Sequence, residues 1–286
     1  MTQVIDNKKE AYHLVQKSRK NNRKIGFVPT MGCLHEGHLT LMKKALSEND
    51  EVWVSIFVNP AQFNDPKDFS SYPRQMEDDL RKLKSIGVDY AFIPDTSEMY
   101  PKGTDNLPKY DLGHLENTLE GKHRPGHFQG VAYIVEQLFQ TLCPHQAYFG
   151  LKDYQQYLII KKMVENQNID TKIVGVETVR ESDGLAKSSR NLLLKKSEKK
   201  DTNRIFAHLK KAEHLLKNGS NPSEIEVQMT KQLNEVEGFH VEYFALRNAS
   251  DLSSLAPAAP LPSEILVCTA VQASHVRLID NIVVKL

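Results

Sequence analysis

The sequence contains little cysteine and no long apolar run, and each of these absences excludes a class of protein. Its three cysteines, Cys33, Cys143 and Cys268, lie far apart among 286 residues and show no paired spacing. A disulfide framework is therefore not expected, and a reducing cytoplasm suits the chain. No apolar run approaches the roughly 20 residues that a membrane-spanning helix needs.

The chain also lacks an excess of charge of either sign. Lys and Arg number 37 against 36 Asp and Glu, which gives a formal net charge of +1. Nucleic-acid-binding domains usually carry a strongly basic face, so we expect no nucleic acid as a partner. The first residues lack a basic stretch followed by an apolar one, so we expect no secretory signal peptide.

Two common nucleotide-binding motifs are missing as well. No Gly-x-Gly-x-x-Gly follows any expected strand, and no Gly-x-x-x-x-Gly-Lys followed by Ser or Thr exists. The first absence argues against a Rossmann dehydrogenase, and the second against a Walker-type phosphate loop. If the protein binds a nucleotide, it does so with a different loop.

Apolar strand patterns and amphipathic helix patterns alternate through the first two-thirds of the chain. Strands are expected near residues 27–28, 51–58, 88–94, 146–149 and 171–176, with helices near residues 8–20, 37–47, 72–86, 131–142 and 154–166. This alternation predicts a doubly wound, Rossmann-like parallel α/β domain over residues 1–179. Residues 96–125 contain few periodic apolar positions, and so long a loop in a compact domain is often a functional cover.

The pattern changes in the last third. Two amphipathic helices, residues 198–217 and 223–236, precede strand patterns at residues 240–246, 265–271 and 276–284. We therefore expect a smaller α+β cap domain with an antiparallel sheet over residues 180–286. Pro257, Pro260 and Pro262 mark a loop between its strands.

A corner between the first parallel strand and the next helix is the strongest functional candidate. It contains His35 and His38, three residues apart, beside Gly32 and Gly37. A helix that begins near Gly37 points unpaired N–H groups at a ligand and favours phosphate. Three interpretations of the histidine pair compete. The first is a metal site, but a zinc-protease motif needs two histidines four residues apart, and these are three apart. In the second, one histidine caps backbone and the other is merely exposed, and in the third both imidazoles donate hydrogen bonds to phosphates.

Other polar residues follow strands in the same way. Asn59 and Gln62 are candidates for holding a small polar substrate, although plain turn chemistry explains them equally well. After the 146–149 strand, Lys152 suits phosphate, Asp153 a helix cap or a ribose, and Gln156 points one turn further in. Hydroxyls and cations between residues 180 and 191 suit phosphate oxygens, or they form an ordinary solvated linker.

Five of these segments together resemble the pantothenate synthetase (pantoate–β-alanine ligase) family. They are residues 29–39 with the two histidines, residues 57–63, residues 124–128, residues 152–156 and residues 188–191, and they occur in the family's order. The resemblance covers most of the first two-thirds, while the last third matches mainly in layout, as a mobile cap.

The resemblance implies roles for individual residues. His38 would be the proton donor and His35 its partner on the phosphates, with Lys152, Ser188, Ser189 and Arg190 as further catalytic groups. Gln62, Gln156 and Asn59 would bind pantoate and β-alanine. The remaining ATP-binding positions would be Met31, Gly32, Cys33, Leu34, Glu36, Gly37, Gly150, Leu151, Asp153, Val179 and Lys187. Asp78 and Asp79 resemble an acidic pair near the metal, although a solvated face near a helix start is their default explanation.

Two positions depart from the family pattern. Leu151 stands where the family more often has Glu or Gln, and Lys187 where it often has Met. Leu151 loses a polar group, although backbone contacts to adenine or ribose could survive there. Lys187 adds a cation, which is compatible with a phosphate site.

The implied reaction is the ATP-dependent condensation of (R)-pantoate with β-alanine to pantothenate, in a precursor pathway of coenzyme A. The pantoate carboxylate would attack the α-phosphate of ATP, and β-alanine would then displace AMP from the pantoyl adenylate. ATP and Mg²⁺ are the expected substrate and cofactor, and a cytoplasmic homodimer is the expected state. The alternatives are another adenylating ligase or nucleotidyl transferase, and a nucleotide sensor without turnover. An aminoacyl-tRNA synthetase is disfavoured by the near-neutral charge.

Overall fold

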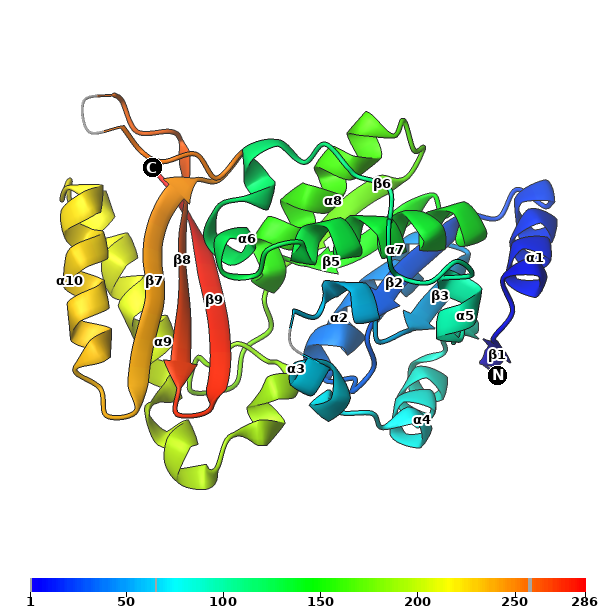
Figure 1. Ribbon diagram of the computed structural model, residues 1–286, viewed down its shortest axis with the longest axis horizontal. Helices are drawn as coiled ribbons and strands as arrows, with labels where there is room; N and C mark the ends of the chain where they lie inside the picture. Colours follow the sequence, from blue (N-terminus) through cyan, green and yellow to red (C-terminus); the bar gives the residue numbers. More distant parts are fainter. Residues whose placement is uncertain (1, 65, 257–258) are drawn as a thin grey trace. The chain divides into compact units, whose positions relative to one another are not determined.

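The computed structural model describes residues 2–64, 66–256 and 259–286 (Figure 1). The expected loop residue Pro257 lies outside these ranges. By its internal contacts the chain divides into two compact units. Unit 1 comprises Met1–Leu151 and Gln155–Glu177, and unit 2 comprises Lys152–Tyr154 and Thr178–Leu286.

Unit 1 is built on a six-stranded sheet in the order β1-β4-β3-β2-β5-β6, in which all neighbouring strands pair in parallel. The strands are β1 (Gln3–Ile5), β2 (Ile25–Thr30), β3 (Glu51–Ile56), β4 (Tyr90–Phe92), β5 (Gln146–Gly150) and β6 (Lys172–Val176). The doubly wound parallel fold is therefore confirmed. The three-residue strand β1 was not predicted from the sequence.

The helices of this part of the chain fall between the strands. The α-helices are α1 (Lys8–Lys20), α2 (Glu36–Glu48), α3 (Pro66–Ser71), α4 (Met76–Ile86), α5 (Thr96–Met99), α6 (Leu119–His123), α7 (His127–Leu142) and α8 (Tyr154–Asn166). Short 3-10 turns occur at η1 (Pro60–Gln62), η2 (Gly113–Glu116) and η3 (Leu151–Asp153).

Helices cover the sheet on both faces, because successive residues of a strand point to opposite sides. Val28 of β2 packs in one apolar cluster with Met42 of α2 and Leu83 of α4. Its neighbour Phe27 contacts Phe139 of α7 edge-on, with the ring centroids 6.2 Å apart. All five side chains are buried, which explains why β2 is nearly continuous in apolar residues.

The strand order places a switch point beside β2. From β2 the chain continues to β3 and β4 on one side, whereas β5 pairs with the other side of β2. In open α/β sheets ligands bind at such a point, outside the carboxyl ends of the strands. The loops after β2, β3 and β5 therefore define the candidate site in unit 1.

Unit 2 contains the antiparallel sheet expected for the last third of the chain. Its strands are β7 (Phe239–Asn248), β8 (Glu264–Ala273) and β9 (Val276–Lys285), paired in the order β7-β8-β9. Helices α9 (Lys196–Lys217) and α10 (Pro222–Asn234) pack on this sheet and on each other through one apolar core. The 3-10 turn η4 (Ser189–Leu193) precedes α9.

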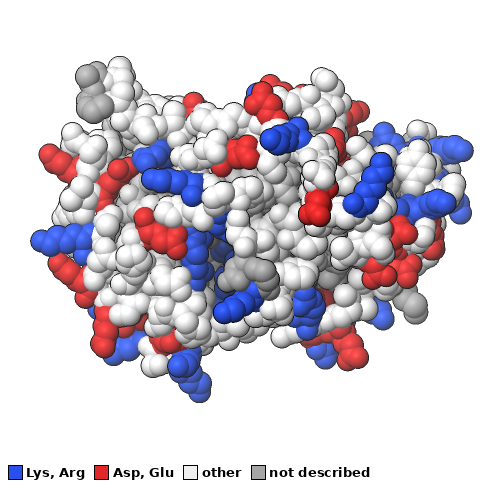
Figure 2. Space-filling model, viewed as in Figure 1, with Lys and Arg blue, Asp and Glu red and all other residues white. Residues whose placement is uncertain are grey.

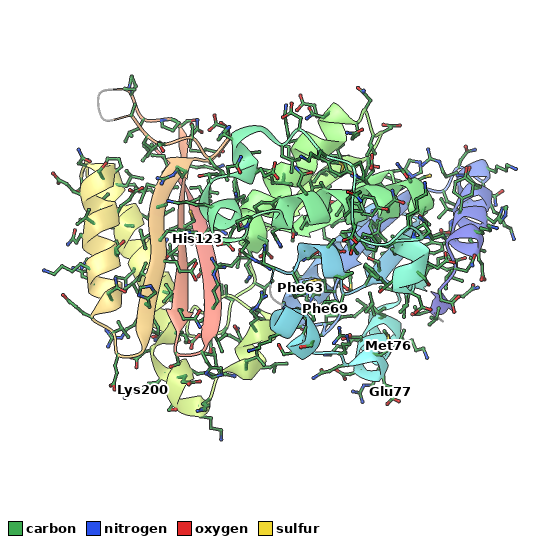
Figure 3. All side chains as sticks on the ribbon, in the orientation of Figure 1. Phe63, Phe69, Met76, Glu77, His123 and Lys200 are labelled. Carbon is green, nitrogen blue, oxygen red and sulfur yellow. The ribbon has the colours of Figure 1, made fainter. Side chains whose placement is uncertain are left out.

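One expectation about the middle of the chain was wrong. Helix α4 begins at Met76 rather than near residue 72, because the separate helix α3 ends at Ser71. Ahead of α4, Phe63 and Phe69 contact each other at 5.4 Å between ring centroids (Figure 3). Residues 96–125 contain α5, η2 and α6, which are too short to show helical periodicity in the sequence.

The surface carries charges of both signs. Figure 2 shows Lys and Arg interspersed with Asp and Glu on the face drawn, in keeping with the formal net charge of +1. Among the residues that the structure describes, no helix combines the length and the apolar character that crossing a membrane requires.

Candidate functional site

Hydrogen bonds of the Thr30 side chain hold the start of the loop after β2 against β3. The Thr30 hydroxyl donates to the carbonyl oxygen of Ser55 in β3 at 2.7 Å and accepts the N–H of Gly32 at 3.2 Å. Gly32 has a φ of +79°, and a Cβ at this residue would lie 3.0 Å from the Asp79 carboxylate. The loop therefore needs glycine both for its backbone conformation and for the close approach of Asp79.

Asp79 of α4 holds the next part of this loop. Its Oδ2 accepts the N–H of Cys33 at 2.8 Å and its Oδ1 accepts the N–H of Leu34 at 2.7 Å. The side chain is buried, and burial raises the pKa of this carboxyl group. Lys82, one turn further along α4, donates to the carbonyl oxygen of Leu34 at 2.6 Å. The expectation of a solvated face is thus wrong for Asp79.

Asp78 behaves differently although it is the adjacent residue. It is half-exposed and forms ion pairs with Arg81 and Lys82. These two cations lower the pKa of its carboxyl group. The described residues contain no cluster of three or more His, Cys, Asp and Glu side chains that could hold a metal ion.

Both histidines cap the start of α2 through the same ring atom. His35 Nδ1 accepts the N–H of Gly37 at 3.1 Å, and His38 Nδ1 accepts the N–H of His35 at 3.3 Å, so that together they form a reciprocal capping box. The interpretation with only one capping histidine is therefore wrong. A neutral ring whose Nδ1 accepts carries its proton on Nε2. The two rings lie 4.1 Å apart between centroids, and in its neutral form each carries an Nε2–H group.

The loop after β3 contains a buried group of amides. Asn59 is almost fully buried, and its Nδ2 donates to Gln62 Oε1 and to the carbonyl oxygen of Gly130, each at 3.1 Å. The Tyr100 hydroxyl donates to Asn59 Oδ1. The Asn59 side chain makes no capping hydrogen bond to η1, so plain turn chemistry does not account for it.

The backbone of Gln62 is fixed from the first residue of α7 and from Arg124, which precedes that helix. His127 Nδ1 lies 2.7 Å from the Gln62 carbonyl oxygen, and Arg124 Nη2 donates to the same oxygen at 3.3 Å. A Cβ on Gly130 would lie 2.3 Å from the carbonyl oxygen of Ala61, so α7 and η1 approach backbone to backbone. The Gln62 side chain donates from Nε2 to the Met31 sulfur at 3.4 Å. This contact joins the loops after β2 and β3.

The end of β5, the first residue of η3 and the first turn of α8 contribute Gly150, Leu151 and Gln156 to unit 1. Leu151 packs against β6, because a Cβ on Gly175 would meet its side chain at 2.7 Å. Gln156 is half-buried. The adjacent Gln155 is buried and donates to the carbonyl oxygens of Leu115 and Thr118 at 2.7 and 2.8 Å, so its amide anchors the 113–123 segment.

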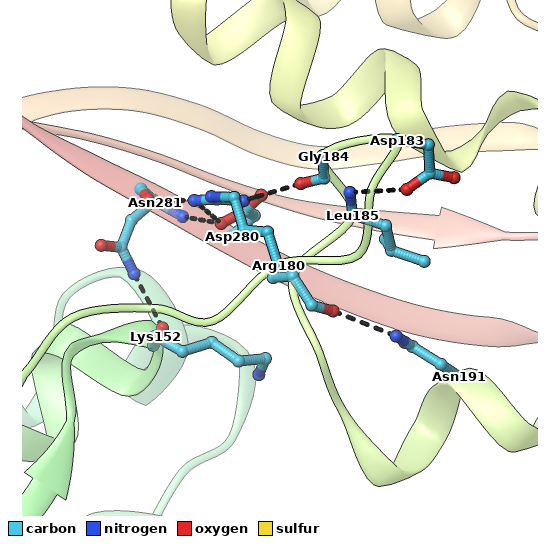
Figure 4. Close-up of polar contacts among 9 residues, drawn as sticks. Lys152, Arg180, Asp183, Gly184, Leu185, Asn191, Asp280 and Asn281 are labelled. Carbon is cyan, nitrogen blue, oxygen red and sulfur yellow. Dashed lines mark hydrogen bonds and ion pairs between the residues drawn. The ribbon is translucent and has the colours of Figure 1, made fainter. Parts of the chain in front are cut away.

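The expected residues Lys152 and Asp153 group with unit 2. Lys152 Nζ lies 3.5 Å from Asp153 Oδ1, and the Asp153 side chain is exposed. The Lys152 carbonyl oxygen accepts from Asn281 Nδ2 at 2.7 Å, which ties this segment to β9 (Figure 4).

A hairpin at residues 179–187 carries two further candidates of unit 2, Val179 and Lys187. Arg180 forms a two-pronged ion pair with the buried Asp280 of β9, at 2.7 and 3.0 Å (Figure 4). The same guanidinium lies over the Phe206 ring at 3.9 Å. Burial raises the pKa of the Asp280 carboxyl group, although Arg180 opposes this effect.

The hairpin leads directly into the expected phosphate-binding residues. The Lys187 N–H donates to the carbonyl oxygen of Val179 at 2.9 Å, and Lys187 Nζ pairs with Glu181 at 3.0 Å. Ser188 Oγ accepts the N–H of Arg190 at 3.3 Å at the start of η4, where Ser189 is buried. These contacts make residues 187–190 a defined turn rather than a plain linker.

Three residues that build these loops were missed or misread in the sequence. Tyr100, Asp79 and Asp280 contact loop residues that lie 41, 45 and 100 positions away along the chain. No periodicity or local motif indicates such partners. For Asp79, the position in the first turn of a helix favoured a solvated carboxylate, which is the opposite of what the structure contains.

Comparison with known proteins decides the family. The family model of pantoate-beta-alanine ligase matches residues 3–283. The chain belongs to this family. The pantothenate synthetase of Staphylococcus epidermidis is 42% identical over 99% of this chain and 98% of its own length.

Solved structures of the family agree. The crystal structure of pantothenate synthetase from Thermus thermophilus superposes with a TM-score of 0.90 at 37% identity, over 98% of this chain and 99% of that chain. The pantoate-beta-alanine ligase of Francisella tularensis, complexed with beta-gamma ATP and beta-alanine, has a TM-score of 0.80 at 38% identity, over 99% and 97% of the two chains. The family, the fold and the reaction predicted from the sequence are confirmed, and the protein is an ATP-dependent ligase of pantoate and β-alanine.

Proposed function

We propose that the chain makes pantothenate through a pantoyl adenylate, and that the loop after β2 handles the phosphates of ATP. The observation that carries this proposal is the capping box of His35 and His38. Because both Nδ1 atoms accept backbone N–H groups, each ring keeps an Nε2–H donor. Two such donors at the start of α2 suit an oxyanion, and the helix dipole adds to the attraction.

In the first step the carboxylate oxygen of pantoate attacks the α-phosphorus and pyrophosphate leaves. His38 and His35 would stabilise the charge that develops on the phosphates. In the second step the amine of β-alanine attacks the acyl carbon, loses a proton, and AMP leaves. Neither step needs a covalent bond to the protein, so binding and alignment of the reactants supply most of the rate enhancement.

Other loops would bind the rest of the substrates. Gln62 and Gln156 in unit 1 suit the oxygens of pantoate, and Asn59 would support Gln62. In unit 2 Lys152, Ser188 and Arg190 offer cations and a hydroxyl, which suit phosphate. The remaining ATP-binding positions are proposed as the sequence analysis gave them, with residues 1–179 as the nucleotide- and pantoate-binding domain and residues 180–286 as the smaller domain.

Magnesium does not fit a site made by Asp78 and Asp79. Both oxygens of Asp79 already accept backbone N–H groups, and Asp78 is paired with Arg81 and Lys82. We propose instead that Mg²⁺ arrives bound to the phosphates of ATP. A homodimer and a cytoplasmic location are part of the proposal, and the three free thiols suit a reducing compartment.

Pantoate-dependent exchange of pyrophosphate into ATP tests the role of the histidines. We expect His38→Ala to lose this exchange, because one of the two donors is gone. A His38→Glu variant is the matched control, because glutamate at this position of a capping box can still accept the N–H of His35 but has no N–H to donate. It should recover thermal stability but not exchange. Normal exchange in His38→Ala would contradict the proposal.

The identity of the acid and of the product is a separate test. Purified protein with ATP, pantoate and β-alanine should yield AMP and pantothenate in equal amounts. Exchange elicited by a different acid, with none from pantoate, would point to another adenylating ligase. Binding of ATP without any AMP would indicate a sensor.

A further inference from the structure

A buried chain of hydrogen bonds runs behind the Gln62 side chain in unit 1. Tyr100 donates through its hydroxyl to Asn59 Oδ1, and Asn59 Nδ2 donates to Gln62 Oε1 at 3.1 Å. Tyr100 and Asn59 are 4% and 1% exposed, and Gln62 is 9% exposed, so water does not compete for these bonds. Burial also raises the pKa of Tyr100, which keeps the hydroxyl protonated as a donor.

The orientation of the Asn59 amide is dictated by its neighbours. The second Nδ2 hydrogen points at the carbonyl oxygen of Gly130, also at 3.1 Å. A carbonyl oxygen only accepts, so the NH₂ end of Asn59 has to face Gly130. The oxygen end then faces Tyr100, whose hydroxyl has to donate. The hydrogen-bonding capacity of Gly130 and Tyr100 therefore determines which end of the Asn59 amide is the oxygen and which is the nitrogen.

The same argument extends to Gln62. Its Oε1 is occupied by the Asn59 NH₂ group, so its own NH₂ group points the other way. There it contacts only the sulfur of Met31, at 3.4 Å, within the part of the chain that the structure describes. A thioether sulfur is a weak acceptor, which an anionic oxygen can replace at little cost.

We propose that Tyr100 is a positioning residue for pantoate selection. Through Asn59 it fixes the Gln62 amide with its NH₂ group outward, so that the loop after β3 presents a donor to an anionic oxygen and not an acceptor. The inference rests on the proposed function, because it assumes that Gln62 meets the pantoate oxygens. The inference specifies that Gln62 contacts pantoate through its NH₂ group. It also assigns a role to Tyr100, which does not itself touch the substrate.

Loss of the Tyr100 hydroxyl releases the two amides from this fixed orientation. With phenylalanine at this position Asn59 Oδ1 has no donor, and a buried oxygen without a donor is costly. A half turn of the Asn59 amide in place would set Oδ1 against the Gly130 carbonyl oxygen, so Asn59 recovers a donor only by shifting its side chain. The shift weakens the hydrogen bond from Asn59 Nδ2 to Gln62 Oε1, and the Gln62 amide can then turn its oxygen outward and repel a carboxylate.

The experiment compares Tyr100→Phe with Tyr133→Phe in the full-length enzyme. Tyr133 stacks on Tyr100 at 5.0 Å, but its hydroxyl contacts the carbonyl oxygen of Met99 at 3.4 Å, outside the chain of amides. We expect Tyr100→Phe to raise the KM for pantoate about tenfold in pyrophosphate exchange, with the KM for ATP unchanged within about twofold. Tyr133→Phe should leave both values unchanged.

A second variant, Asn59→Asp, enforces the reversed polarity. An ionised aspartate oxygen in place of Nδ2 can only accept, so Gln62 has to turn its NH₂ group inward. Thermal stability should fall as well, because the same oxygen faces the Gly130 carbonyl oxygen. The KM for pantoate should then rise more than in Tyr100→Phe, with the KM for ATP again unchanged. A merely structural role of Tyr100 would lower kcat and thermal stability and raise both KM values alike.

The possible outcomes separate the two proposals. If the wild-type enzyme shows no pantoate-dependent exchange, the proposed function fails. If the wild-type enzyme is active and Tyr100→Phe keeps the wild-type KM for pantoate, or shifts both KM values together, the positioning role is overturned while the function stands. A selective rise in the KM for pantoate in Tyr100→Phe and Asn59→Asp, absent from Tyr133→Phe, supports the inference.

Discussion

Two buried aspartates hold the two loops that carry most of the proposed ATP-binding residues, and they do so by different means. In unit 1, Asp79 accepts two backbone N–H groups of the loop itself, from Cys33 and Leu34. In unit 2, Asp280 pairs with the Arg180 side chain at the base of the 179–187 hairpin. The first carboxylate shapes a backbone, and the second joins a hairpin to a strand.

This difference determines what each aspartate requires from its surroundings. Asp79 has both oxygens satisfied by neutral donors, so its negative charge is spread over hydrogen bonds without a salt bridge. Asp280 faces a cation that is itself largely buried, with 17% of the Arg180 side chain exposed. A buried ion pair is costly to break from one side, because the remaining charge has no partner. We therefore expect substitution of Asp280 to be the more destabilising.

The largest effect should come from Asp280→Ala, which leaves the Arg180 guanidinium buried and unpaired. We expect a loss of about 3–5 kcal/mol in the free energy of unfolding of unit 2. Urea denaturation followed by circular dichroism measures it. The double variant Arg180→Ala with Asp280→Ala should lose less than the sum of the single variants.

Lys285→Met is a suitable control for this experiment, since it breaks an exposed pair with Glu264. Exposed pairs contribute about 0–1 kcal/mol, so its effect should be small. A loss in Asp280→Ala no greater than in this control would show that the Arg180 pair does not stabilise the hairpin.

An intermediate effect is expected for Asp79→Asn. The amide oxygen can accept only one of the two N–H groups, and its NH₂ group faces the other, so one buried donor loses its partner. Such a loss costs about 1–3 kcal/mol. Because the displaced residues Cys33 and Leu34 belong to the proposed ATP loop, the KM for ATP should rise in pyrophosphate exchange.

Asp78→Asn is the matched control, since it changes the adjacent, half-exposed residue in the same way. It should leave the KM for ATP unchanged. If both variants raised that KM equally, the effect would come from the local charge of α4 and not from the hydrogen bonds of Asp79.

The smallest effect concerns how the stabilising contributions of Asp78 and Asp79 change with pH, which should be in opposite directions. Ion pairs hold the pKa of Asp78 below its ordinary value of 3.8, so its stabilising contribution is complete above that value and is lost as the pH falls below it. Burial raises the pKa of Asp79 above 3.8, so its contribution relative to asparagine decreases as the pH rises through its folded pKa.

The measurement is the unfolding free energy of wild type, Asp78→Asn and Asp79→Asn between pH 3 and pH 6.5, at roughly half-unit steps about the ordinary carboxyl pKa. The stability advantage of the wild type over Asp78→Asn should increase with pH below 3.8, and its advantage over Asp79→Asn should decrease with pH above 3.8. Slopes of the same sign would disprove the assignment of two different environments.

The elements that the sequence predicted well are those whose signal is local. The repeated apolar positions of residues 8–20 and the apolar run of β3 reflect faces that are buried along their whole length. Short elements carry no such signal, and this is why β1 and α5 were missed. The start of α4 was misplaced because α3 precedes it within the same polar stretch.

The residues of the candidate site also differ in whether a local sequence signal reveals them. The histidine loop and the Asn59–Gln62 loop were found because their residue types and glycines stand together in the sequence. Their supports were not found, because Asp79, Tyr100 and Gly130 reach these loops only through the folded sheet. Which end of an amide faces a substrate depends on such partners, and so no local pattern can encode it.

The close approach of α7 to η1 has a consequence for how motion reaches the substrate loop. At Gly130 a hydrogen atom stands where a methyl group would collide with the Ala61 carbonyl oxygen, and His127 of the same helix holds the next carbonyl oxygen, that of Gln62. Helix α7 and turn η1 are therefore in direct backbone contact, with no side chain between them at Gly130. A shift of α7 along its axis would carry Gln62 with it directly, without any relay of side chains.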